Sequence, residues 1–271
     1  MYKILALDLD GTLLNKKHEI SAKNREMIEK VRKKGIKVIL ISGREPGSVK
    51  CYSEQLGLEE ILSGFNGGII ADNRGEKIYF NQCLHAELAK ETIFLSEKMN
   101  MCNVVFIGNK LYTQDKKDSR FKTFEKYTLV SIEEVGCLST FLEKNKLWSN
   151  INKILLTDDN KILNEYRDIL EEKVDGDLTM QYSLPFFLEI FSKDISKGGA
   201  LEEISKLYKV DREEIIAIGD GENDITMIEY AGLGVAMDNA PENVKKIADF
   251  ITLSNEEDGV SNVIEKFIVN K

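Results

Sequence analysis

The stretch LALDLDGTLL, residues 5–14, joins an apolar run to two aspartates and a glycine. The apolar run predicts a buried β-strand, and residues two apart on a strand point to the same side. Asp8 and Asp10 can therefore present two carboxylates to one space at the end of the strand. Two like charges so close together repel each other and require a cation or a shared proton. Mg²⁺ is such a cation, because it takes carboxylate, water and phosphate oxygens as ligands. The alternative to a cation site, and the more common meaning of an isolated D-x-D pattern, is a pair of solvated aspartates in a turn.

Strands and helices alternate around this stretch. Ser21 is a candidate N-cap and Gly35 a candidate end for the first helix. The predicted elements are a strand over residues 2–9, a helix over 21–35, a strand over 36–42, and, near the C-terminus, strands over 214–220 and 233–237 with helices over 225–232 and 240–248. Continuous apolar strands of this kind predict a parallel sheet covered on both faces, with ligands bound beyond the carboxyl ends of the strands.

The middle of the chain has a different pattern, with several strands per helix. Helices are predicted near 85–100 and 160–174, and strands at 102–108, 110–113, 151–157, 178–183 and 186–191. Such a pattern is typical of a separate α+β unit with its own sheet. We therefore expect an α/β protein with two domains: a core of residues 1–82 plus 188–271, and an inserted domain of residues 83–187.

A second polar stretch follows an apolar strand in VILISGREPGSV, residues 38–49. The backbone N–H of Gly43 can approach an anion closely, and Ser42 and Arg44 carry donors that suit a phosphate. Taken alone, Ser-Gly after a strand is equally typical of an ordinary turn.

Two more stretches carry charge at similar places. In SKGGAL, residues 196–201, Ser196 is a candidate N-cap and Lys197 lies in the first turn of a helix. A cation there opposes the helix dipole, and a nearby anionic cluster would offset that cost. A solvated surface lysine is an equally good interpretation. In GDGENDITM, residues 219–227, an acidic loop with Asp220, Asn223 and Asp224 ends another apolar strand, and it does not fit the EF-hand pattern.

Composition excludes several classes of protein. The 37 Lys and Arg against 46 Asp and Glu leave a net charge of −9 without a long basic stretch, which disfavours a nucleic-acid partner. No apolar run approaches the roughly 20 residues of a membrane span, so we expect a cytoplasmic protein without a membrane partner. The four cysteines form no C-x-x-C pair, and the two histidines, His18 and His85, lie outside the stretches above.

Together, DLDGTL (residues 8–13), ISGR (41–44), SKGGAL (196–201) and GDGENDITM (219–227) resemble, in this order, the haloacid dehalogenase superfamily of phosphohydrolases. The resemblance is to its Cof-type branch. It implies a Rossmann-like core with a parallel sheet, and it implies that the inserted segment is an α/β cap domain between the second and third motifs. GFNGGII, residues 64–70, is similar to a turn of the family and offers Asn66 as a polar contact.

The resemblance also implies roles for residues. Asp8 would attack phosphorus and form an aspartyl-phosphate, and Asp10 would be the general acid and then the general base. Ser42, Gly43, Arg44, Lys197 and Asn223 would bind the phosphate. Magnesium would be held by Asp8, the backbone carbonyl of Asp10 and Asp220, with Asp224 behind these ligands or reaching the ion through water.

The resemblance thus implies a magnesium-dependent phosphatase of small phosphorylated metabolites such as sugar phosphates. Two alternatives stay open. One is a phosphotransferase or phosphomutase of the same fold, and the other is a module that binds a phosphorylated metabolite without catalysis. A pair of carboxylates with separate roles argues against the last, because binding alone needs no nucleophile. The sequence leaves the oligomeric state open.

Overall fold

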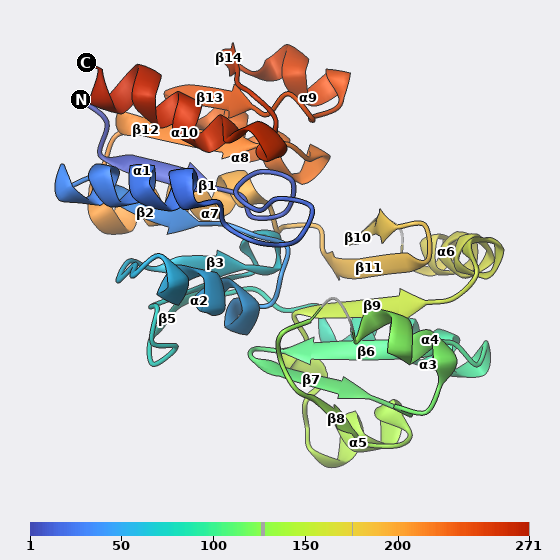
Figure 1. The fold of residues 1–271 in the computed structure, drawn as a ribbon. Helices are drawn as coiled ribbons and strands as arrows, with labels where there is room; N and C mark the ends of the chain where they lie inside the picture. Colours follow the sequence, from blue (N-terminus) through green and yellow to red (C-terminus); the bar gives the residue numbers. More distant parts are fainter. Residues whose placement is uncertain (126–127, 175, 271) are drawn as a thin grey trace. The chain divides into compact units, whose positions relative to one another are not determined.

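A computed structural model describes residues 1–125, 128–174 and 176–270 (Figure 1). The chain divides into two compact units, Met1–Phe80 with Ser196–Lys271, and Asn81–Ile195. We call them the core unit and the cap unit. The expected boundary at residues 187 and 188 differs from this division. Residues 188–192 belong to a strand, β11 (Phe187–Ser192), that pairs with strands of the cap unit on both sides, and this pairing carries the chain into the cap unit up to Ile195.

A parallel sheet forms the centre of the core unit. Its order is β14–β13–β12–β1–β2, and every neighbouring pair is parallel, as the sequence predicted. The strands are β1 (Ile4–Leu7), β2 (Lys37–Leu40), β12 (Ile215–Gly219), β13 (Leu233–Ala236) and β14 (Phe250–Ile251). Ile4 lies opposite Lys37 on one side and Ile215 on the other. β1 therefore occupies an inner position, with β12 and β2 as its neighbours.

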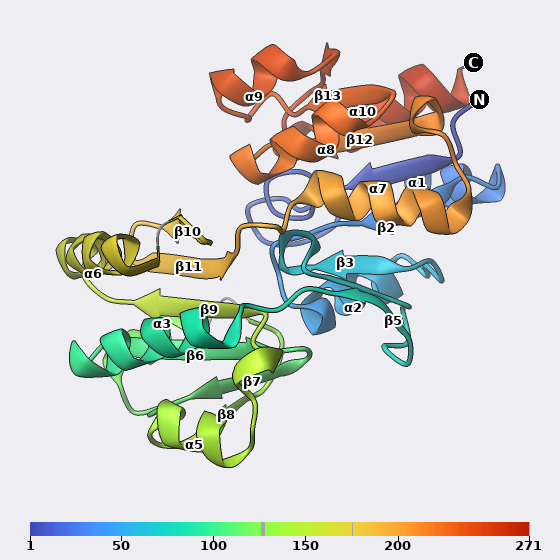
Figure 2. The same ribbon diagram turned by 180° about the vertical axis from the view of Figure 1, so that it is seen from behind.

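Helices cover both faces of this sheet. α1 (Ala22–Lys33) and α10 (Gly259–Ile264) lie on the face seen in Figure 1, and α7 (Lys197–Tyr208) and α8 (Ile225–Tyr230) on the face seen in Figure 2. The alternation of side chains along β1 explains both layers: Leu5 and Leu7 join the hydrophobic cluster of α1 and α10, and Ile4 and Ala6 join the cluster of α7 and α8.

Local chemistry sets the helix ends. The Ser21 hydroxyl oxygen accepts a hydrogen bond from the backbone N–H of Asn24 at 3.0 Å, which satisfies a free donor at the start of α1. Pro46 opens α2 (Pro46–Gln55), where its fixed φ suits the first turn. The core unit also contains the helix α9 (Glu242–Ile247) and a small sheet in the order β3 (Leu62–Gly64), β4 (Ile69–Ala71) and β5 (Ile78–Asn81), of which only the last residue, Asn81, belongs to the cap unit.

The cap unit has a mixed sheet in the order β10–β11–β9–β6–β7–β8. Its other strands are β6 (Cys102–Ile107), β7 (Lys110–Thr113), β8 (Ile132–Glu134), β9 (Lys153–Thr157) and β10 (Leu178–Leu184), and its helices are α3 (Ala86–Lys98), α4 (Ser119–Phe124), α5 (Leu138–Lys144) and α6 (Asn160–Val174). β7 and β8 pair in parallel, whereas β6, β9, β10 and β11 pair antiparallel. Ile93 of α3 and Leu163 of α6 belong to one hydrophobic cluster with Ile154 and Ile190 of the sheet. The inserted α/β cap expected from the sequence is thereby confirmed. None of the helices in the described ranges has the length and hydrophobicity that a membrane crossing requires.

Candidate active site

Three loops of the core unit meet because their strands are neighbours. Asp8 follows β1, Ser42 follows β2, and Asp220 follows β12, and these strands lie side by side in the order β12–β1–β2. The backbone N–H of Asp8 still donates to the carbonyl of Ile218, at 3.1 Å, so the ladder continues to the first residue of the site. Parallel strands place their carboxyl ends at one edge of a sheet, which is where open α/β sheets bind ligands.

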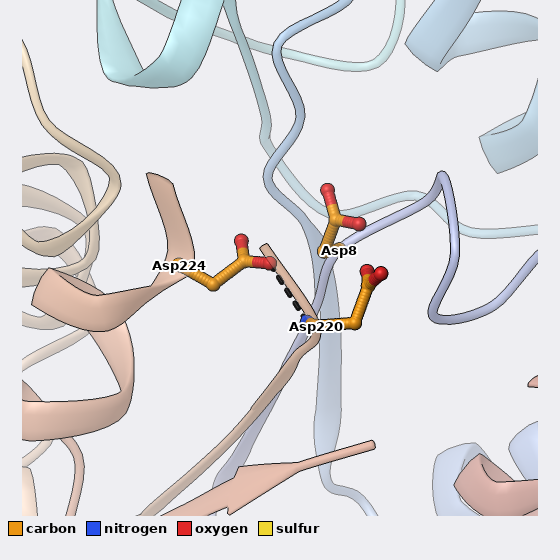
Figure 3. Close-up of side chains that lie close together, drawn as sticks. All are labelled: Asp8, Asp220 and Asp224. Carbon is orange, nitrogen blue, oxygen red and sulfur yellow. Dashed lines mark hydrogen bonds between the residues drawn. The ribbon is translucent and has the colours of Figure 1, made fainter. Parts of the chain in front are cut away.

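Asp8, Asp220 and Asp224 form a cluster of carboxylates at this edge (Figure 3). Each offers an oxygen, and these oxygens all lie within 4.8 Å of one another. Asp8 is 4% exposed and Asp224 is 1% exposed. One carboxylate oxygen of Asp224 accepts hydrogen bonds from the backbone N–H groups of Asp220 (2.9 Å) and Gly221 (2.8 Å), which holds the acidic loop in shape.

Lys197 is completely buried in this cluster. Its Nζ lies 2.6 Å from an oxygen of Asp8 and 2.5 Å from an oxygen of Asp224. The neighbouring glycine makes this possible: a Cβ at Gly198 would lie 2.4 Å from the carbonyl oxygen of Thr226, so only glycine lets α7 approach α8 so closely. Of the two interpretations that the sequence left open for Lys197, the structure therefore supports the anionic cluster and excludes a solvated lysine.

Burial and mutual repulsion perturb the acids of the cluster. Burial raises the pKa of Asp8 well above its usual range, Lys197 opposes the rise, and Asp224 and Asp220 add to it. Burial and the charge of Asp224 raise the pKa of Asp220 to about 6, against a hydrogen bond from the Thr12 hydroxyl. For Lys197, burial lowers the pKa, but Asp224 and Asp8 outweigh it and leave the pKa above its ordinary value.

The donor set of this described cluster fits a hard divalent cation. Three carboxylates against the single charge of Lys197 leave an excess of two negative charges when all are ionised. Such an excess is costly in a buried place unless a cation neutralises it. Carboxylate oxygens are the ligands that Mg²⁺ prefers. The aspartate triad is typical of the metal site of haloacid dehalogenase-like hydrolases.

Asp10 lies at the edge of the cluster and is paired with Arg44. The guanidinium donates from Nε to one carboxylate oxygen and from Nη2 to the other, both at 2.7 Å. Burial raises the pKa of Asp10, but the hydrogen bonds and charge of Arg44 outweigh it and leave the pKa below its ordinary value. The sequence predicts Arg44 as a phosphate ligand, whereas in the structure its guanidinium contacts a carboxylate.

The phosphate-binding candidates are linked through Asn66. The backbone N–H of Asn66 donates to the carbonyl of Ser42 at 2.9 Å, and the Asn223 amide donates to the Asn66 side-chain oxygen, also at 2.9 Å. A Cβ at Gly43 would lie 2.9 Å from that same oxygen, so any other residue there would have to displace the Asn66 side chain. Ser42 is buried, with its hydroxyl oxygen accepting from the backbone N–H of Arg44 at 3.2 Å. The structure thus brings Ser42, Gly43, Asn66 and Asn223 together.

Three further residues, not predicted from the sequence, contact the residues of the site. Thr12 donates to Asp220 at 2.9 Å, and its place inside DLDGTL was an available signal. The Asn239 amide donates to the carbonyl of Gly11 (2.8 Å) and to Asp220 (3.1 Å), and it lies after β13, beyond the quoted motifs. His18, placed outside the motifs from the sequence, has its Nδ1 3.3 Å from Nη2 of Arg44 and 3.5 Å from an oxygen of Asp10.

Comparisons with known proteins agree with this geometry. The profile of the haloacid dehalogenase-like hydrolases matches residues 5–264. Phosphatase YwpJ of Bacillus subtilis is 31% identical over 287 residues, covering 98% of this chain and 100% of that protein. The 5-amino-6-(5-phospho-D-ribitylamino)uracil phosphatase YitU of the same organism is 30% identical over 271 residues, covering 97% of each. A solved haloacid dehalogenase-like hydrolase from Bacteroides thetaiotaomicron aligns with a TM-score of 0.91 at 32% identity, covering 99% of this chain and 100% of that one.

A family profile that spans nearly the whole chain, relatives that match over their full length, and an acidic site at the carboxyl edge of the parallel sheet agree with one another. The chain belongs to the haloacid dehalogenase-like hydrolases of the Cof-type branch and is a phosphatase, a phosphoric monoester hydrolase that acts on small phosphorylated compounds.

Proposed function

We propose that this phosphatase hydrolyses small phosphorylated metabolites, sugar phosphates among them, through an aspartyl-phosphate on Asp8 and with Mg²⁺ as its metal. The observation that carries the proposal is the position of Asp8. Asp8 directly follows β1. Its carboxylate lies 2.6 Å from the buried Nζ of Lys197 and forms the carboxylate cluster together with Asp220 and Asp224. A nucleophile beside a cation and a metal site suits an incoming phosphate dianion.

Asp8 and Asp10 divide the chemistry between them. In the first step an Asp8 oxygen forms a bond to phosphorus while the bond from phosphorus to the leaving oxygen breaks. The electron pair stays on the leaving oxygen, which takes a proton from Asp10. Asp10 therefore enters this step protonated, although Arg44 lowers its pKa. In the second step a water oxygen forms a bond to phosphorus, the bond to Asp8 breaks, and Asp10 takes a proton from the water. Phosphate leaves, and both carboxyl groups return to their starting forms.

The surrounding residues stabilise negative charge. Lys197, Ser42, the backbone of Gly43 and Asn223 bind phosphoryl oxygens, where positive charge and donors lower the energy of the transition state. Asp8, Asp220 and the backbone carbonyl of Asp10 would hold Mg²⁺, with Asp224 behind them or reaching it through water. When bound, Mg²⁺ supplies positive charge that neutralises the transferring group.

The name of one relative supports small phosphorylated metabolites as the substrate class. YitU carries in its name a phosphorylated ribitylamino compound, a small molecule with a phosphate on a sugar-derived chain. Its sequence matches this chain over almost the full length of both. We therefore infer that soluble phosphate monoesters of this size are the substrates to test first.

Phosphate release from a panel of metabolites tests the proposal. The panel contains sugar phosphates, flavin mononucleotide, pyridoxal phosphate and nucleoside monophosphates, each with Mg²⁺ and with a chelator. Wild type is compared with Asp8→Asn, which keeps the volume and removes the nucleophilic charge, and with Asp238→Asn, a control whose side chain is 64% exposed. We expect release that needs metal, is lost in Asp8→Asn and is unchanged in Asp238→Asn. Wild-type-like release from Asp8→Asn would overturn the role of Asp8. Transfer to an added sugar instead of water would establish a phosphotransferase.

A further inference from the structure

Arg44 and Asp10 form a bidentate ion pair. Nε and Nη2 donate to different oxygens of the carboxylate, each at 2.7 Å. This parallel arrangement fixes the plane of the carboxylate as well as its distance, and hydrogen bonds between two charged groups are about twice as strong as neutral ones. A lysine would place a point charge nearby without that directional control.

Arg44 is itself held on several sides. Its guanidinium lies over the ring of Tyr52, 5.5 Å from the centroid, and Nη2 is 3.3 Å from Nδ1 of His18. Its backbone N–H donates to the Ser42 hydroxyl oxygen, and its carbonyl accepts from the N–H of Phe65 at 2.9 Å. The side chain is only 15% exposed. Tyr52 and His18 thus contact the guanidinium itself, and the two backbone hydrogen bonds hold the loop segment that carries it.

Asp10 differs from the other acids of the site. Its side chain is 45% exposed, whereas Asp8 and Asp224 are buried. A half-exposed aspartate can change rotamer at little cost unless a partner holds it. Among the described residues, Arg44 is the one that donates hydrogen bonds to both carboxylate oxygens of Asp10.

We infer that Arg44 is a positioning residue that orients the Asp10 carboxyl for proton transfer, and that it does not act by binding the substrate phosphate. The inference rests on the proposed function, in which Asp10 first gives and then takes a proton. A carboxylate has about four sites for hydrogen bonds. Arg44 donates to two of them, so another can carry the proton that passes to the leaving oxygen and, once that proton has left, can accept a hydrogen bond from the water. Proton transfer needs a heavy-atom distance of about 2.6–3.2 Å, and a misplacement of about 1 Å can lower the rate by about 100-fold.

A double-mutant cycle distinguishes positioning from phosphate binding. The variants are Arg44→Lys, Asp10→Ala and the two combined, with Arg74→Lys as a matched control on an exposed arginine of the core unit. Two quantities are measured: kcat and KM for one sugar phosphate in the presence of Mg²⁺, and the affinity for inorganic phosphate by calorimetry, which needs no turnover. Thermal unfolding of each variant checks the fold.

If Arg44 acts through Asp10, Arg44→Lys lowers kcat by about 10- to 100-fold, changes KM and phosphate affinity less than about twofold, and has no further effect when Asp10 is already alanine. Arg74→Lys leaves every quantity unchanged. Losses that multiply in the double variant, or a tenfold weaker binding of phosphate by Arg44→Lys, would overturn the inference while leaving the proposed function intact. Absence of phosphate release by the wild type would overturn the proposed function, and the inference with it.

Discussion

Replacement of Asp220 by asparagine should make the metal-free protein more stable and remove its response to metal. Asp220 accepts hydrogen bonds from the Thr12 hydroxyl at 2.9 Å and from the Asn239 amide at 3.1 Å. An asparagine can keep both contacts, because Asn239 can donate to the new amide oxygen and a hydroxyl can accept from the new amide nitrogen. The substitution therefore removes the charge with little change in shape.

The size of the effect follows from the pKa of Asp220. Burial, followed by the charge of Asp224, raises this pKa from 3.8 to about 6. At 1.36 kcal/mol per pKa unit, ionising the folded protein costs about 3 kcal/mol of stability. The pKa is higher in the folded than in the unfolded chain, so the folded state binds more protons between these values. The contribution of Asp220 to stability is fully present below about pH 4 and is lost as the pH rises through about 6.

The free energies of unfolding of the two proteins should therefore diverge with pH. Asp220→Asn should exceed wild type in free energy of unfolding by about 1–2 kcal/mol at about pH 5 and by about 3 kcal/mol at about pH 7.5, both in chelator. Native-state hydrogen exchange of the β1 and β12 amides, read by mass spectrometry, measures this in the core unit. Trp148, the one tryptophan of the sequence, lies in the cap unit and does not report on it.

A metal arm and a control complete the experiment. Added Mg²⁺ should stabilise wild type but not Asp220→Asn, because ligands stabilise only the state that binds them. Asp238→Asn, at an exposed site, should stay within about 0.5 kcal/mol of wild type at every pH. Equal stability of wild type and Asp220→Asn across the pH range, or a variant that is less stable at about pH 7.5, would refute the reasoning from buried charge repulsion.

Other substitutions test neighbouring features of the site. Lys197→Met should destabilise the core unit by about 3–5 kcal/mol near neutral pH, because it leaves Asp8 and Asp224 buried without their cation. Urea denaturation followed by circular dichroism measures the free energy of unfolding, and a loss below about 1 kcal/mol would contradict this expectation. Gly11→Ala should lose activity and about 1–3 kcal/mol of stability, because Gly11 has a φ of +81° and a Cβ there would lie 2.2 Å from an oxygen of Asp220. Enzyme kinetics and the same denaturation experiment test this. Wild-type activity together with wild-type stability would be evidence against a steric need for glycine at this position.

Much of the fold and the main acids of the site were predictable from the sequence. The range 160–174 was predicted as a helix and is α6, and Ser21 was predicted as an N-cap and caps α1. Apolar periodicity and cap chemistry act between residues that are close in sequence, so they can be read directly. The same holds for Asp8 and Asp220, since each directly follows an apolar strand and parallel strands end at the same edge of their sheet.

Only the tertiary structure decided which partner each charged group has. Lys197 is buried rather than solvated because Gly198 lets α7 approach Thr226. Arg44 contacts Asp10, 34 positions away in sequence, and His18 and Asn239 reach the site from loops whose local sequence carries no signal of it. Residues 188–192 join the cap unit because β11 pairs with β9 and β10. Contacts between distant parts of the chain depend on how strands and helices pack, and local sequence patterns do not specify that packing.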